Sequence, residues 1–175
     1  MTDFYTLIPP VQLGDFSIEL LSDKHLRQSF VDENIPVPNQ EINIKIGLYY
    51  ETVNRIGADF FDIGGIPVFS KNALEHFPKE VLDEFSFHPI HLTFKGGTMI
   101  FYAGKTKNYH HIIDEDKTNI QQIGRTNIIT KPIFRCEEFD FYAIRDKKYP
   151  RILVFTDKMI DVIKSSSMKI VYIKL

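Results

Sequence analysis

The chain has 175 residues and a formal net charge of −2, and 43% of its residues are hydrophobic and 25% charged. This length and composition predict a single folded domain over residues 1–175, able to bury roughly two thirds of its unfolded surface in one core. No apolar run approaches the ~20 residues of a membrane span, and no dense basic cluster with interleaved aromatic residues points to nucleic-acid binding.

The N-terminus and the cysteine content bear on the compartment. The first residues lack a basic stretch followed by an apolar one, so we expect no secretion signal. Cys136 is the only cysteine, so no disulfide can form within the chain and no oxidising compartment is needed. We expect Cys136 to be a small core residue, because it lies among aromatic residues. These observations favour a cytoplasmic protein.

The first 40 residues are expected to be an elaboration on a core that spans residues 41–175. The apolar and aromatic stretch Phe4–Ile8 predicts a strand, which two prolines end. Ser22 is a good helix N-cap, since a serine hydroxyl accepts hydrogen bonds from the free amides of a first turn. Leu26 and Phe30 follow it at helical spacing, so we expect a short helix here.

The core opens with a strand pattern. From Glu41 to Gly47, isoleucines at positions 42, 44 and 46 alternate with polar residues. Successive side chains of a strand point to opposite faces, so this period of two predicts a strand with one buried face.

A unit of strand, helix cap and short helix then occurs twice. Ile66–Phe69 and Arg151–Phe155 are rich in β-branched and aromatic residues, and each stops at a hydroxyl residue, Ser70 or Thr156. Apolar residues at helical spacing follow each hydroxyl, namely Ala73, Leu74 and Phe77, then Met159, Ile160 and Ile163. We therefore predict a helix N-cap at Ser70 and at Thr156. The second helix has room to cross between parallel strands before a last strand at Lys169–Ile173.

A hairpin is the clearest sheet signal. His88–Phe94 and Thr98–Ala103 are β-rich runs separated by Lys95, Gly96 and Gly97, and glycine tolerates the positive φ of a tight reversal. Further short strands are expected at Tyr109–Ile113, Ile128–Thr130, Ile133–Cys136 and Phe139–Ile144. Together these patterns predict an α+β domain with a mixed, largely antiparallel sheet and a few short helices.

Charge is spread unevenly along the chain. Residues 1–95 carry 7 basic and 14 acidic side chains, whereas residues 96–175 carry 14 and 9. Either these charges mix in space once the chain folds, or the first half forms an acidic face that attracts a basic partner.

Two groups of acidic residues are the candidates for chemistry or binding. Asp59 and Asp62 flank an aromatic pair just before two glycines, and Asp114, Glu115 and Asp116 form an acidic loop. Neither group has a nucleophile, a metal-ligand spacing or a phosphate-binding glycine pattern beside it. We therefore expect no catalytic residue, no metal and no cofactor.

Several segments in one order carry a family resemblance, namely Asp59–Asp62, Gly65–Leu74, Phe87–Ile90, Asp114–Asp116, Pro132–Arg135 and Ile152–Asp157. This order resembles a family of bacterial immunity proteins encoded beside polymorphic toxins, formerly catalogued as a domain of unknown function. The likeness covers roughly residues 45–175, and residues 10–40 have no counterpart in it.

The resemblance implies a cytoplasmic protein, not an enzyme, that binds one cognate secreted toxin domain and blocks it in the producing bacterium. On this interpretation neither nucleic acid nor membrane is a partner, and Asp59, Asp62, Asp114, Glu115 and Asp116 are candidate toxin-binding residues. The alternative is a small hydrolase-like enzyme that uses the acids near Asp59 and Asp62 in a cleft.

Overall fold

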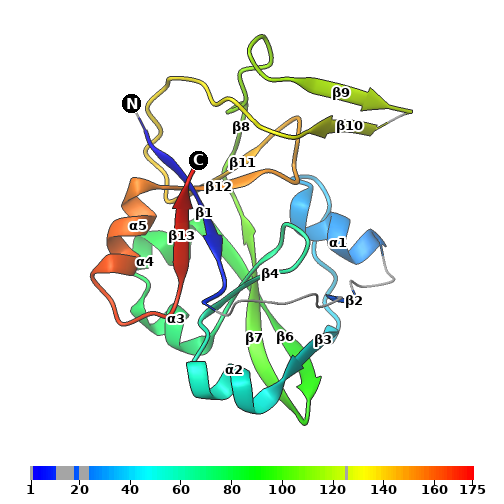
Figure 1. Ribbon diagram of the computed structural model, residues 1–175, viewed down its shortest axis with the longest axis vertical. Helices are drawn as coiled ribbons and strands as arrows, with labels where there is room; N and C mark the ends of the chain where they lie inside the picture. Colours follow the sequence, from blue (N-terminus) through cyan, green and yellow to red (C-terminus); the bar gives the residue numbers. More distant parts are fainter. Residues whose placement is uncertain (1, 11–17, 20–23, 125) are drawn as a thin grey trace.

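The computed structural model describes residues 2–10, 18–19, 24–124 and 126–175, and it confirms the α+β class (Figure 1). The helices are α1 (Lys24–Val31), α2 (Tyr50–Ile56), α3 (Lys71–His76), α4 (Lys79–Glu84) and α5 (Asp157–Lys164). The strands are β1 (Phe4–Ile8), β2 (Ile18–Glu19), β3 (Asn43–Tyr49), β4 (Phe60–Asp62), β5 (Pro67–Phe69), β6 (Phe85–Lys95), β7 (Gly97–Thr106), β8 (Tyr109–His110), β9 (Ile120–Ile123), β10 (Thr126–Ile129), β11 (Ala143–Asp146), β12 (Leu153–Thr156) and β13 (Val171–Lys174).

The strands divide into two sheets and a separate ribbon rather than the one sheet that the sequence predicts. One sheet has the order β2-β3-β6-β7-β5-β4, the other β13-β1-β12-β11-β8, and within the described part of the chain β9 pairs only with β10. Among the described pairs, β3–β6 and β8–β11 are parallel and the others antiparallel. Figure 1 shows the β9–β10 ribbon reaching out from the two sheets at the top of the molecule.

The β6–β7 hairpin forms as predicted. Its register runs from Phe85 opposite Thr106 to Phe94 opposite Gly97, and Gly96 has a φ of +97°. Gly97 lies so close to the ring of Tyr50 that a Cβ there would approach Cδ2 of that ring to 2.6 Å. The glycine pair therefore serves both the turn and the packing of α2 against the hairpin.

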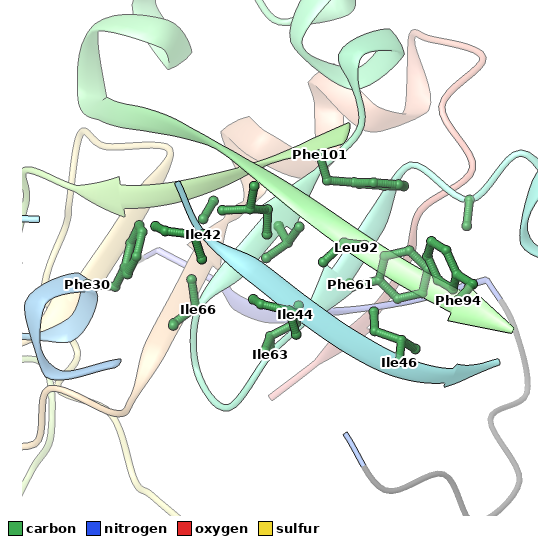
Figure 2. Close-up of a cluster of buried hydrophobic side chains, with 14 of the residues drawn as sticks. Phe30, Ile42, Ile44, Ile46, Phe61, Ile63, Ile66, Leu92, Phe94 and Phe101 are labelled. Atoms are coloured by element: carbon green, nitrogen blue, oxygen red, sulfur yellow. The ribbon is translucent and has the colours of Figure 1, made fainter. Parts of the chain in front are cut away.

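The alternating isoleucines of β3 and of the residue before it build the first core. Ile42, Ile44 and Ile46 are buried in one cluster with Leu92 of β6 and Phe30 of α1 (Figure 2). The expected helix carrying Leu26 and Phe30 is α1, and both side chains are buried. The predicted cap at Ser22 lies outside the described residues.

Strands β4 and β5 are buried on both faces, which explains the second sheet. Phe61 and Val68 pair across the two strands and face the first core, whereas Phe60 and Phe69 pair and face a second one. Strands with two apolar faces must be covered from both sides. Helices α3, α4 and α5 and strand β1 of the five-stranded sheet supply the second cover.

The repeated strand–cap–helix units are β5–α3 and β12–α5. Ser70 is the N-cap of α3, and its side chain accepts a hydrogen bond from the Ala73 amide at 3.0 Å. Thr156 is the N-cap residue of α5, but its hydroxyl makes no capping bond and donates to the Phe141 carbonyl at 2.6 Å. Helix α5 does cross between parallel strands, with β1 inserted between β12 and β13.

Residues 109–144 differ most from the predicted strands. The β8 strand is only two residues long, the segment 133–136 contributes an isolated bridge between Phe134 and Ile113, and β11 begins at Ala143. Residues 112, 113, 134, 139 and 141 instead form a third apolar cluster with β1, β11 and β12. Cys136 is exposed, so its predicted core position is wrong.

Among the described residues, no helix is long and apolar enough to cross a membrane.

Candidate functional site

The five candidate acidic residues lie in three places. Asp59 precedes β4 and Asp62 ends it, and these two carboxylates have no hydrogen-bond partner in common among the described residues. The acidic loop Asp114–Asp116 lies between β8 and β9. Asp59 and Asp62 therefore bond to different parts of the chain.

Asp59 is an internal brace. It is only 3% exposed, and its carboxylate accepts hydrogen bonds from the Ser70 hydroxyl, from the Asn72 amide at 3.1 Å and from the Lys169 backbone amide at 2.7 Å. It thereby ties the start of α3 to the segment before β13. A carboxylate satisfied in this way holds the fold together and presents no surface to a partner.

Asp62 is in contact with the loop that follows β4. Its Oδ1 accepts a hydrogen bond from the Gly65 amide at 2.7 Å. The residue is exposed to solvent, yet partial burial of its carboxyl raises its pKa. The Gly65 amide and the charges of Arg145 and Arg27 act in the opposite direction. Asp62 is thus part of a charged group around this loop.

The acidic loop lines an open cleft of about 610 Å³ together with Arg135, Cys136 and Glu137. Lys117 Nζ lies 2.8 Å from Asp114 Oδ2, and this hydrogen bond lowers the pKa of Asp114. Lys148 forms an ion pair with Glu115. These contacts are at the surface, so they orient the loop while adding little stability.

The β9–β10 ribbon stands beside this loop and exposes apolar side chains. The antiparallel register places Ile123 and Ile128 on one face, where they are 62% and 39% exposed. At the foot of the ribbon, Ile133 is 40% exposed and its carbonyl accepts the Asp114 amide at 2.8 Å. Apolar and acidic surface therefore adjoin each other here.

A basic cleft is the feature that sequence reasoning missed. It measures about 620 Å³ and lies between α1, β10 and the turn from β11 to β12, with Arg27, Lys148 and Arg151 in its lining. Arg27 is far in sequence from Lys148 and Arg151, and the three cations belong to no motif. The glycine pair at positions 64 and 65, beside which the arginines lie, was the only feature of the sequence that could have indicated this cleft.

The described residues hold no cluster of three or more His, Cys, Asp or Glu side chains that could bind a metal ion. His110 instead stacks on Phe141, with ring centroids 5.0 Å apart, and burial lowers the pKa of His88.

No known protein family matches the chain, and no curated protein matches it. The similarity to immunity proteins therefore remains a prediction from the segments quoted above.

Proposed function

We propose that this protein is an immunity protein, which binds a cognate secreted toxin domain in the cytoplasm of the producing bacterium and blocks the toxin's activity. The toxin-binding surface in this proposal consists of the β9–β10 ribbon, Ile133 and the acidic loop Asp114–Asp116. This surface is called the ribbon face below.

The observation that carries the proposal is the exposed apolar ribbon. A two-stranded ribbon has little stability of its own in water, and Ile123 and Ile128 gain nothing from the fold by facing solvent. Exposed apolar residues with a polar rim are typical of protein-binding surfaces, in which a few apolar anchors supply most of the affinity. Here the acidic loop supplies the rim.

The charge of the rim favours a basic toxin. Of the six residues that line the acidic cleft, four are acidic and one is Arg135. Lys117, Lys148 and Arg135 pair with three of these acids, so a modest negative charge remains on the rim. A negative rim accelerates encounter with a positive surface, and salt screens this attraction over the ~10 Å Debye length reached near 0.1 M. The acidic residues at issue are in the second half of the chain, so the acidic first half is not needed for this attraction.

Growth rescue tests the function itself. The toxin encoded by the adjacent gene is expressed with and without this protein. We expect the toxin-expressing cells to grow only when this protein is also present. Protection requires near-complete occupancy, which corresponds to nanomolar affinity or better, about −12 kcal/mol. If the toxin still arrests growth when this protein is abundant and folded, the proposal is wrong.

Variants of the ribbon face locate the interface. We expect Ile123→Ser to weaken toxin binding by about fivefold or more, because truncating an apolar anchor removes about 1 kcal/mol or more. Neutralising the loop with Asp114→Asn, Glu115→Gln and Asp116→Asn should slow association and flatten its salt dependence.

Matched controls lie on other elements. Ile100→Ser removes an isoleucine that is 54% exposed on β7, and Glu75→Gln, Asp83→Asn and Asp161→Asn neutralise three acids on α3, α4 and α5. We expect both controls to bind the toxin like the unmodified protein. Rescue that persists with the ribbon-face variants but fails with the controls would place the interface elsewhere.

A further inference from the structure

Three arginines from distant parts of the chain meet at the Gly64–Gly65 loop. Arg27 Nε donates to the Gly64 carbonyl at 2.9 Å, and Arg145 Nη2 donates to the Gly65 carbonyl at 2.9 Å. The backbone of Arg151 packs on the same loop, since a Cβ on Gly65 would lie 3.2 Å from the Arg151 carbonyl oxygen. With its φ of +87°, Gly65 permits a close approach that other residues would obstruct.

The positive charge gathered here is only partly balanced. The side chains of Arg27 and Arg145 donate hydrogen bonds to backbone carbonyls. No carboxylate of the described residues lies within ion-pair distance of Arg27, Arg145 or Arg151. Burial and the neighbouring charge of Arg151 lower the pKa of Arg27, while the carboxylate of Asp62 raises it. Two guanidinium groups that repel each other across a cleft would both gain from an anion placed between them.

A fully buried arginine supports the cleft from behind. Arg145 is 0% exposed, its Nη1 donates to the Pro150 carbonyl at 2.6 Å, and its buried Nε has no hydrogen-bond partner among the described residues. Burial lowers the pKa of Arg145 to about 10. Pro150 lines the cleft, so the hydrogen bond from Arg145 fixes part of the cleft wall.

The walls of the cleft suit an organic group rather than a bare ion. Val31, Ile152 and the ring of Tyr149 line it, and Ile129 closes it from the ribbon side. Its volume of about 620 Å³ lies within the roughly 300–1,000 Å³ common for small-molecule sites. The acid in its lining, Asp32, accepts a hydrogen bond from the Asn34 amide at 2.9 Å.

We propose that this cleft binds a small organic phosphate of nucleotide size, with the phosphate between Arg27 and Arg151 and the organic part against Val31, Tyr149 and Ile152. A phosphate matches the planar fork of a guanidinium better than a point charge does, and its charge of nearly −2 balances two arginines where a single carboxylate would balance one. Asn127 and Ile129 of the cleft lining lie on the side of the ribbon opposite Ile123 and Ile128, so the cleft and the ribbon face adjoin each other across the ribbon.

Titration calorimetry with ADP, inorganic phosphate and citrate at equal ionic strength tests the proposal. We expect ADP to bind one to one, inorganic phosphate to compete with it more weakly because it lacks the organic part, and citrate to bind more weakly than ADP. No binding of ADP at millimolar concentration would overturn the proposal. Citrate binding as tightly as ADP would also overturn it, because the cleft would then select carboxylates.

Three substitutions connect binding to the cleft. Arg151→Gln should weaken ADP binding by about tenfold or more, the size expected for a lost charge-assisted hydrogen bond. Arg151→Lys keeps the charge but loses the fork, so we expect an intermediate affinity. Arg55→Gln, which changes an exposed arginine in the last turn of α2, is the control and should leave affinity unchanged.

Each variant is first compared with the unmodified protein by thermal unfolding, because only variants with a native-like transition are informative about binding. The side chain of Arg151 is exposed, so we expect both Arg151 variants to fold. Equal ADP affinity of the unmodified protein and a folded Arg151→Gln variant would place the ligand outside the cleft and contradict the proposal.

Discussion

Asp59 and the acidic loop Asp114–Asp116 carry the same functional group and do opposite things. The carboxylate of Asp59 is buried and accepts hydrogen bonds from three residues of two distant segments. The carboxylates of the loop are at the surface and pair with exposed lysines, Lys117 and Lys148. The first arrangement fixes the fold, and the second leaves charge available for a partner.

This difference alters the list of candidate binding residues. The sequence puts Asp59 in the toxin-binding set and gives no reason why replacing it should harm the protein. In the structure Asp59 has almost no accessible surface, whereas the loop residues line an open cleft. Asp59 therefore belongs to the scaffold, and the loop residues keep their place in the proposed interface.

The largest effect should come from Asp59→Ala. It removes a buried charged acceptor and leaves the part-buried donors of Ser70, Asn72 and Lys169 without this partner, which typically destabilises a protein by about 2–3 kcal/mol. Urea denaturation measures the change in the free energy of unfolding. The control is Asp116→Ala in the exposed loop, for which we expect less than about 0.5 kcal/mol. Equal stability of the two variants would refute the distinction between brace and loop.

A smaller loss is expected for Ser70→Ala, which acts on the same brace. The Ser70 hydroxyl caps α3 and donates to Asp59, and losing a helix cap costs about 1–2 kcal/mol. Because the two residues share one network, the double variant with Asp59→Ala should lose less than the sum of the single losses. Ser165→Ala, at an exposed serine after α5, is the matched control. Strict additivity would mean that the two side chains act independently.

The sequence predicts the core well where periodicity carries the information. The isoleucines of β3, the β6–β7 hairpin and helices α3 and α5 all follow from local spacing, because burial on one face imposes a period of two or about 3.6. Prediction fails between residues 109 and 144, where short segments are held by side-chain bonds. Buried Asp146, for example, accepts the backbone amides of residues 112, 113, 148 and 149.

The roles of individual polar side chains were less predictable than the core, because these roles depend on contacts between distant segments. Ser70 and Thr156 occupy the same position in two similar units, yet only Ser70 caps its helix through its side chain, since Phe141 lies within reach of Thr156. The arginines of the basic cleft are likewise brought together by tertiary structure alone. No spacing rule connects residues 27, 145 and 151 to a pair of glycines at 64 and 65.

The smallest expected effect is on the pH dependence of stability, and it distinguishes Asp62 from an acid in a different environment. Burial raises the pKa of Asp62, so its ionised form is less favourable in the folded protein than in the unfolded chain. The side chain introduced by Asp62→Asn resembles the protonated carboxyl and can still accept from the Gly65 amide. This variant should therefore be as stable as the unmodified protein well below about pH 4. It should become the more stable of the two as the pH rises from about 4, the ordinary pKa of aspartate, through the raised value, and keep a constant advantage above it.

Asp114→Asn is the matched comparison, because its expected sign is opposite. The hydrogen bond from Lys117 lowers the pKa of Asp114, so its ionised form stabilises the folded state above the ordinary pKa and this contribution is lost as the pH falls through the lowered value. The variant should thus be the less stable protein at neutral pH, and the difference should vanish in acid. Denaturation midpoints between about pH 3 and pH 7 measure both differences. If both variants shifted in the same direction at neutral pH, the environments assigned to these two carboxylates would be wrong.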